Sequence, residues 1–392
     1  MISFDKAIET VLKAANRTVG KEKISFTDAL GRILSSDVQS DMDMPPFNKS
    51  AVDGFACRRR DLSLELKVIE TIPAGKRPQK RIGSGECARI MTGAPIPEGA
   101  DAVIMVEDAE TTGENRIRYR KPDVKDNICY LGEDIRKGRK VVSAGTRIEP
   151  QHIAVLATVG CVEPEVYERV KTGIVSTGNE IIEPHEKPSS PEIRNSNAYQ
   201  LMAQAKETSA DPTYYGIAKD DPASTRSILE KAIRNEDIVL ITGGVSMGDY
   251  DFVPQVLEEL GTKILFDSVA VQPGRPTVFG TVDGKFVFGL PGNPVSSFVQ
   301  FELLVKPLIN RLSGSDFSPP VVKLPLALDY TRRKSTRLSV LPVTLDTEGR
   351  VVPLEYHGSA HINALTAAFG FMFVPTGQTR IEKGSIIDVR QI

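Results

Sequence analysis

The sequence predicts a multidomain protein in which an α/β domain, with a doubly wound and mostly parallel sheet, is joined to smaller β-rich domains. First, 392 residues exceed what one ordinary hydrophobic core accommodates. Second, strand-like and helix-like patterns alternate through residues 171–311, as they do where helices cover a parallel sheet. Third, short strand-like runs separated by Pro and Gly precede and follow that region, which is typical of compact β domains.

Four domains are predicted along the chain. Residues 4–15 place apolar side chains on one helical face behind Ser3 as N-cap, and a second short helix is expected at about 26–34 behind Ser25. The predicted domains are a discontinuous, helical α+β linker domain at 1–41 and 136–170, an inserted β-rich domain at 42–135, the α/β domain at 171–314 and a C-terminal β-barrel-like domain at 315–392.

The charge balance and the cysteines exclude several classes of protein. Lys plus Arg is 49 and Asp plus Glu is 51, and a net charge of −2 argues against a general binder of nucleic acid or membrane surfaces. The four cysteines are isolated, so neither a disulfide scaffold nor a zinc ribbon is expected. No signal-peptide pattern and no apolar run of membrane-spanning length is present, so a cytoplasmic protein is expected.

Five unusual loops follow the predicted strands of the α/β domain and fall on one edge of its sheet. The carboxyl ends of parallel strands meet at one edge, where such folds bind ligands. A phosphate-bearing ligand is expected there, because the loops are rich in glycine, acids and hydroxyls. The candidates on this edge are Thr177, Gly178, Glu180, Asp220, Asp221, Gly243, Gly244, Ser246, Asp249, Asp251, Arg275, Pro291, Gly292, Asn293 and Ser296.

The loop at 242–251 indicates a phosphate site that is assisted by a metal ion. Its paired glycines permit a tight turn that aims backbone N–H groups at an anion, and a helix is expected just beyond. Asp249 and Asp251 would repel a bare phosphate, so we expect Mg²⁺ between them and the ligand. Glu180 and either Asp220 or Asp221 would converge on the same cation, while Ser246 and Ser296 would lie near the phosphates.

Each of these loops also has an ordinary interpretation. A single Gly-Gly or Pro-Gly is more often a plain turn, and Glu180 taken alone fits a solvated loop acid. Asp221 precedes Pro222 and equally fits the start of the next helix. The coincidence of five such loops on one edge favours a ligand site.

Other segments outside this edge carry candidate residues. In residues 43–56 two prolines stiffen the chain before a turn that presents Asp53, although this segment taken alone favours a domain-linking loop with an apolar anchor. Asp134 and Thr92 lie in segments that by default are surface turns. The Gly-Ser loop at 357–361 would accept an oxyanion through Ser359, and an ordinary β-domain loop fits at least as well.

Six distinctive motifs occur along the chain. In order they are Pro45-Pro46-Phe47-Asn48-Lys49-Ser50-Ala51-Val52-Asp53-Gly54-Phe55-Ala56, Met91-Thr92-Gly93-Ala94-Pro95, Gly132-Glu133-Asp134-Ile135, Ser176-Thr177-Gly178-Asn179-Glu180, Gly243-Gly244-Val245-Ser246-Met247-Gly248-Asp249-Tyr250-Asp251 and Gly289-Leu290-Pro291-Gly292-Asn293-Pro294. Together these motifs resemble the MoeA family of molybdopterin molybdenumtransferases, which is related to the gephyrin E domain. The resemblance covers essentially the whole chain.

The resemblance implies a reaction, an assembly and a set of site residues. Adenylylated molybdopterin is cleaved with Mg²⁺ present, molybdate is placed on the dithiolene and AMP is released. The assembly is an elongated homodimer whose cleft is shared between subunits, and a molybdopterin adenylyltransferase is the expected pathway partner. Carried over by motif, the acids are Asp53, Asp134, Glu180, Asp249 and one of Asp220 and Asp221, with Thr92 nearby.

The chain departs from the family pattern at four positions. Gln272 and Arg275 stand where members often have Lys. One positive charge is kept, at Arg275, whose planar guanidinium replaces the point charge of a lysine ammonium. Asn48 and Asn179 stand where members often have an acid, so the site is less negative. Arg275, the helix start at Pro291, Gly292 and Asn293, and the Ser359 loop are the candidate donors to the molybdate dianion.

Two other functions remain as alternatives. A molybdopterin adenylyltransferase shares the α/β fold and would consume ATP, but normally lacks the additional domains. A non-catalytic scaffold of the gephyrin kind would retain its function after loss of Asp249.

Overall fold

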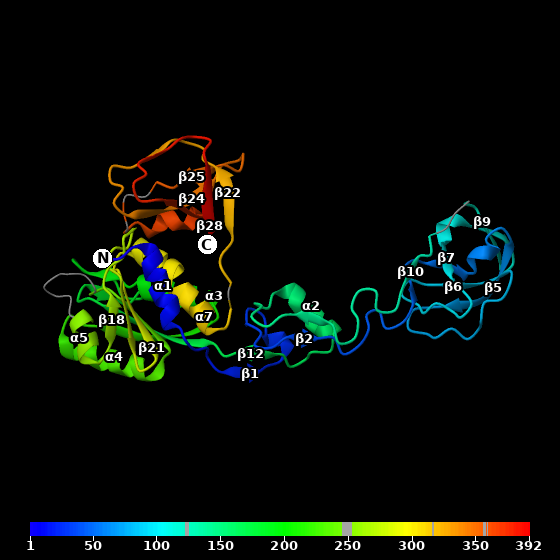
Figure 1. Ribbon diagram of the computed structural model, residues 1–392, viewed down its shortest axis with the longest axis horizontal. Coiled ribbons are helices and arrows are strands. Elements are labelled where there is room, and N and C mark those ends of the chain that lie inside the picture. The colour runs from blue at the N-terminus through cyan, green and yellow to red at the C-terminus, as the bar shows by residue number, and fades with distance from the viewer. Residues whose placement is uncertain (122–124, 245–252, 316, 356–357, 359) are drawn as a thin grey trace. The chain divides into compact units, whose positions relative to one another are not determined.

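The computed structural model describes residues 1–121, 125–244, 253–315, 317–355, 358 and 360–392. The chain separates into two compact units (Figure 1). Unit 1 comprises residues 1–36, 144–150 and 163–392, and unit 2 comprises residues 37–143 and 151–162. The division into four domains stays a prediction, because unit 1 holds parts of three predicted domains.

The centre of unit 1 is a six-stranded sheet, and the predicted doubly wound, mostly parallel architecture is confirmed. Five strands run in one direction and β20 runs in the other. The strand order is β16 (Ala210–Ala218), β13 (Val170–Thr177), β17 (Ile238–Thr242), β21 (Lys285–Leu290), β20 (Val278–Val282) and β18 (Lys263–Phe266).

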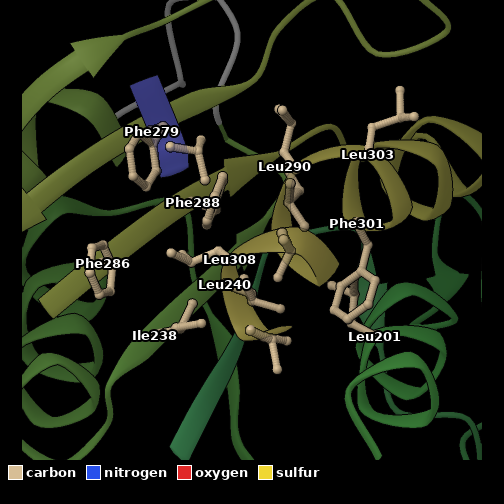
Figure 2. Packing of buried hydrophobic residues seen from close by; sticks show 14 of the residues in the cluster. Leu201, Ile238, Leu240, Phe279, Phe286, Phe288, Leu290, Phe301, Leu303 and Leu308 are labelled. Carbon is tan, nitrogen blue, oxygen red and sulfur yellow. The ribbon is translucent and has the colours of Figure 1, made fainter. Parts of the chain in front are cut away.

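Alternating side chains on the buried strands build two hydrophobic layers. On β17, Ile238 and Leu240 face one layer while Val239 and Ile241 face the other, as the two-residue period of a strand requires. Figure 2 shows the first layer, where Leu201 and Leu308 come from helices and Phe286 and Phe288 from β21. The first layer contains residues of α1 (Phe4–Ala14), α3 (Asn197–Glu207), α6 (Pro294–Gln300) and α7 (Lys306–Leu312), and the second contains residues of α4 (Pro222–Asn235) and α5 (Val253–Glu259).

A hairpin and a long helix complete the α/β part. Asp283 and Gly284 both adopt positive φ between β20 and β21, which is the turn that the Asp-Gly pair predicts. Beyond β21 the chain is helical through α6, a π-helical turn η4 (Phe301–Val305) and α7. Inside this helix the Glu302 carboxylate is buried, and it accepts hydrogen bonds from Lys306 Nζ at 2.8 Å and Gln204 Nε2 at 2.9 Å.

A second six-stranded sheet of unit 1 is built from the C-terminal part of the chain. Arg390 of its strand β28 donates through Nη2 to the Glu302 carbonyl at 2.7 Å, so the two sheets are linked through the π-helical turn. The strand order is β19 (Val271–Gln272), β24 (Leu338–Leu345), β26 (Gly370–Val374), β28 (Ile386–Gln391) and β22 (Val321–Pro325), and β25 (Val351–Pro353) also pairs with β24. Outside this sheet, β23 (Tyr330–Thr331) pairs with β27 (Arg380–Ile381), and the 3₁₀ helix η5 (Ile362–Ala367) precedes β26.

The N-terminal helix is confirmed, and the second predicted helix is wrong. Lys6 N donates to Ser3 Oγ at 3.2 Å, so Ser3 caps α1 as expected. In place of a helix at 26–34 there is only the 3₁₀ turn η1 (Phe26–Asp28). Gly31 then takes a φ of 77°, and Ile33 and Leu34 form isolated β-bridges with Arg147 and Val166. These two apolar residues are therefore buried from an extended chain and not from a helix. Nearby, β1 (Lys21–Lys23) pairs with β12 (Glu165–Tyr167).

The edge strand β16 of the α/β sheet carries a bulge. Its register against β13 shifts between Ile174 and Ser176, where β16 contains one additional residue. Gly216 lies in this stretch with a φ of 97°, a value that side chains rarely tolerate.

Unit 2 contains a third six-stranded sheet, in agreement with the expected β-rich character. Cys57 and Cys87 face each other across it, fully buried, and burial raises the pKa of each thiol to about 12. The strand order of this sheet is β7 (Ala102–Met105), β4 (Gly54–Cys57), β6 (Glu86–Ile90), β5 (Glu65–Ile72), β9 (Arg116–Tyr119) and β8 (Ala109–Gly113). Unit 2 also contains two strand pairs, β3 (Lys49–Ser50) with β10 (Ile128–Cys129) and β2 (Val38–Gln39) with β11 (Lys140–Val142). Its helical segments are the 3₁₀ turns η2 (Arg59–Asp61) and η3 (Val106–Asp108) and most of α2 (Pro150–Thr158).

The close approach of β4 to β7 at Gly54 can be tested by substitution. A Cβ at this position would lie 1.8 Å from the Ile104 carbonyl oxygen, so Gly54→Ala must separate the strands. We expect a loss of about 3 kcal/mol in the free energy of unfolding of unit 2, measured by chemical denaturation. Gly113→Ala is the control, because a Cβ there meets no atom within 4 Å. Equal stability of the two variants would contradict the expectation.

Candidate functional site

A hollow of about 610 Å³ lies in unit 1 at the carboxyl ends of β13, β17 and β21, the edge at which such sheets bind ligands. The structure brings nine of the predicted site residues to it: Thr177, Gly178, Glu180, Asp220, Gly243, Gly244, Pro291, Gly292 and Asn293. Their chemical roles stay predictions. The remaining lining residues are Ser176, Ile181, Ile193, Arg194, Asn195, Ser196, Asn197, Thr242, Pro276, Pro294 and Ala360.

The Gly243–Gly244 turn is pressed against the end of β13. Gly243 has a φ of 94°, and a Cβ on it would lie 2.6 Å from the Thr177 carbonyl oxygen. Gly244 has a φ of 64°, and a Cβ on it would lie 2.8 Å from Thr177 Oγ1. Both positions therefore require glycine for their conformation and for the space. Thr177 Oγ1 is buried without a hydrogen-bond partner in the described part of the chain.

Two carboxylates line the hollow on neighbouring loops. The Glu180 carboxylate lies over Gly178, where a Cβ would stand 2.7 Å from Glu180 Oε2. Asp220 accepts from Asn179 N at 2.9 Å, while Asp220 N donates to Asn179 Oδ1 at 3.2 Å. Asn179 thus joins the loop after β13 to the loop after β16.

Asn197 holds two of the loops together, a role that the sequence analysis did not assign. It is 7% exposed, and its Nδ2 donates to Thr242 Oγ1 and to the Gly292 carbonyl, both at 2.8 Å. The carbonyl can only accept, which fixes the orientation of the amide. Asn197 Oδ1 is left buried without a partner among the described residues. The polar run Asn195-Ser196-Asn197 before a helix was the available signal.

A partly buried polar network supports the arm of chain that carries Glu180. This arm contains the short parallel strands β14 (Ile181–Ile182) and β15 (Ile193–Arg194). The Glu183 carboxylate accepts hydrogen bonds from Tyr214 Oη at 2.7 Å and Tyr199 Oη at 2.9 Å. Burial and the bond to Glu183 raise the pKa of Tyr214 well above its usual range, so the phenol stays a donor.

Three predicted residues do not line this hollow. Asp221 caps α4, where its Oδ1 accepts from Ser224 N at 2.8 Å, as the ordinary interpretation held. Ser296 is buried within α6. Arg275 is exposed on the loop after β19, and its neighbour Pro276 lines the hollow instead.

Four predicted residues, Ser246, Asp249, Asp251 and Ser359, lie outside the described residues. Within the described ranges, no three acids, histidines or cysteines lie close enough together to hold a metal ion. Glu180 and Asp220 are therefore the part of the predicted metal set that the structure places at the hollow.

The remaining predicted residues lie in unit 2. Asp53 Oδ1 accepts from Thr92 N at 2.6 Å and from Thr92 Oγ1 at 2.8 Å, so the structure brings these two predicted residues together. The backbone bond, followed by the hydroxyl bond, lowers the pKa of Asp53. Asp134 is exposed on another loop of unit 2, where its N–H donates to the Met44 carbonyl.

None of the helices in the described ranges combines the length and the apolar character that a membrane crossing requires.

The α/β fold and its edge hollow define a ligand-binding domain, and comparisons identify the family. Models of the MoeA N-terminal region (domain I and II), a probable molybdopterin binding domain and the MoeA C-terminal region (domain IV) match residues 2–160, 173–311 and 323–392. The chain therefore belongs to the MoeA family, and it is a transferase of molybdenum cofactor biosynthesis.

Individual relatives agree over nearly the whole chain. Molybdopterin molybdenumtransferases of Staphylococcus epidermidis (strain RP62A) and Staphylococcus aureus (strain COL) are each 36% identical, over 99% and 93% of this chain and 95% and 90% of their own. The crystal structure of the molybdopterin biosynthesis MoeA protein from Pyrococcus horikoshii OT3 is 30% identical, covers both chains completely and gives a TM-score of 0.86.

The bond between Asp53 and Thr92 can be tested by titration. Thr92→Val removes the hydroxyl donor but keeps the backbone N–H, so the pKa of Asp53 should rise part of the way to the ordinary aspartate value. Carbon NMR of the Asp53 carboxyl group against pH measures this shift. Thr92→Ser keeps the hydroxyl and should leave the pKa low. A pKa that does not rise in Thr92→Val contradicts the assignment.

Proposed function

We propose that the protein cleaves adenylylated molybdopterin in a Mg²⁺-dependent reaction, inserts molybdate into the dithiolene and releases AMP. The hollow at the sheet edge is the observation that supports this most, because it joins two surfaces that such a substrate needs. Ile181 and Ile193 provide apolar contact for a ring system. The glycine turn at Gly243 and Gly244 lets backbone approach a diphosphate closely.

The described residues fit a magnesium site in part. Glu180 and Asp220 supply hard carboxylate oxygens at the hollow, and Thr177 Oγ1 is a buried oxygen without a partner among the described residues. Glu180 and Asp220 would hold the ion, with Asp249 and Asp251 as further predicted ligands. Bound there, Mg²⁺ would neutralise phosphate charge and polarise a phosphoryl oxygen.

The residues of the chain would bind and orient the substrate. Asn197 keeps the Gly243 turn and the Gly292 loop at a fixed separation, so the hollow keeps its shape while the substrate enters. Thr92 holds the Asp53 carboxylate ionised and in one orientation, as a ligand to a cation requires.

We also propose the homodimer with a shared cleft. Predicted catalytic acids fall in both units, with Asp53 and Asp134 in unit 2 and Glu180 in unit 1. Two subunits that each contribute one unit to a cleft would complete the set. The adenylylated substrate requires a preceding adenylyl transfer, for which a molybdopterin adenylyltransferase is the proposed partner.

The choice between Asp220 and Asp221 is open to a direct test. Asp220→Asn keeps an acceptor for Asn179 N but removes the charge, so AMP release from adenylylated molybdopterin with Mg²⁺ and molybdate should fall about 100-fold. Asp221→Asn is the matched control, because asparagine also caps helices and activity should persist. The reverse pattern contradicts the assignment, and no AMP release by the unmodified protein refutes the proposed reaction.

Mixing subunits tests the shared cleft. Asp53→Ala and Asp220→Asn should each be nearly inactive alone. Random pairing of the two variants makes half of the dimers mixed, and each mixed dimer would have one intact cleft, so co-expression should restore roughly a quarter of normal AMP release. Activity that stays at the level of the single variants would place both acids in one subunit's site or exclude the dimer.

A further inference from the structure

Arg194 is the one cation among the described residues that line the hollow. It lies on the two-residue strand β15, where it is paired in register with Ile182. Glu180 and Asp220 line the same hollow, and the bond that Arg194 makes among the described residues goes to the Glu186 carbonyl rather than to either acid. An exposed cation at the lining of an otherwise acidic hollow is suited to an anionic ligand. Arg194 lies outside the five loops and the six family motifs.

The guanidinium of Arg194 is oriented by the backbone. Its Nε donates to the Glu186 carbonyl at 3.0 Å, which occupies the one N–H of the guanidinium that faces back along the side chain. The two terminal nitrogens remain, and a guanidinium presents them as a planar fork that matches two oxygens of a phosphate. No described residue accepts a hydrogen bond from either terminal nitrogen.

The Glu186 carbonyl is itself held in place. Glu186 N donates to the Glu183 carbonyl, and Glu183 N donates to Glu186 Oε1, each at 3.0 Å, so the turn between them is closed from both sides. The Glu183 carboxylate is fixed in turn by Tyr199 and Tyr214. The two phenols thus fix the Glu183 side chain, and the turn fixes the Glu183 backbone next to the Glu186 carbonyl that orients Arg194. Such support reduces the entropy that the side chain loses when it binds a ligand.

We propose that Arg194 binds a phosphate group of the ligand in this hollow through its two terminal nitrogens. The inference rests on the proposed function, in which that phosphate belongs to an adenylylated substrate and leaves as AMP. It also distinguishes Arg194 from Arg275, the cation favoured by sequence, which is exposed and does not line the hollow.

Titration calorimetry with the full-length protein and Mg²⁺ tests the inference. The probes are AMP, inorganic pyrophosphate and adenosine, which lacks the phosphate. Arg194→Gln should raise the Kd of AMP and pyrophosphate about 10- to 100-fold and leave the Kd of adenosine unchanged. Arg194→Lys should recover part of the loss, since it restores the charge without the fork. Arg234→Gln, at an exposed arginine of α4, is the control and should bind all probes normally.

The outcomes separate this inference from the proposed reaction. If the unmodified protein releases AMP from the adenylylated substrate while Arg194→Gln binds AMP and pyrophosphate normally, only the role of Arg194 is overturned. If adenosine binding falls as far as AMP binding, the residue is structural and the inference fails. If pyrophosphate binding depends on Arg194 but no AMP is released from the substrate, the phosphate site stands and the reaction is wrong. If the unmodified protein binds neither AMP nor pyrophosphate, both are overturned.

Discussion

The contact between the Gly243–Gly244 turn and Thr177 is the constraint on which the described site depends. Two adjacent strands of the parallel sheet end beside each other, and the chain leaving one turns directly against the last residue of the other. Any side chain at either glycine would move the turn away from β13. The space beyond that contact is the hollow, and Asn197 fixes its other wall through Gly292.

The sheet can position these loops because its strands are held on both faces. Alternating side chains of β17 fill two separate hydrophobic layers, so a shift of the strand along its axis would disturb both. The layer on the side of α3 and α7 continues toward the C-terminal sheet, where Val340 and Phe371 belong to the same cluster. The buried Glu302, with Lys306 and Gln204, adds polar contacts that only one arrangement satisfies. The rigidity of the site thus comes from the packing of the two hydrophobic layers against the sheet.

Much of this fold followed from local pattern. The two-residue and helical periods predicted the α/β alternation, the Asp-Gly pair predicted the β20–β21 turn, and Ser3 predicted the start of α1. The apolar residues at 26–34 were misread, because Gly31 and pairing with distant residues such as Arg147 decide their conformation.

The sequence predicted only those site residues that directly follow the ends of strands. Asp220 and Asp221 are neighbours in sequence, and the choice between lining the hollow and capping α4 depends on backbone direction. The polar run before α3 marks the segment of Asn197, but its bond to Gly292 joins residues far apart in the sequence and could not be predicted from it. The bond of Arg194 to the Glu186 carbonyl has no signal in the local sequence.

The bulge on β16 affects whether a strand of another chain can be added to this edge of the sheet. The edge of a sheet exposes a row of backbone donors and acceptors that another chain's strand can extend. Gly216 interrupts that row in the middle of β16, and Pro212 removes a donor near its beginning. This edge of the α/β sheet is therefore a poor template for added strands, which disfavours edge-to-edge aggregation.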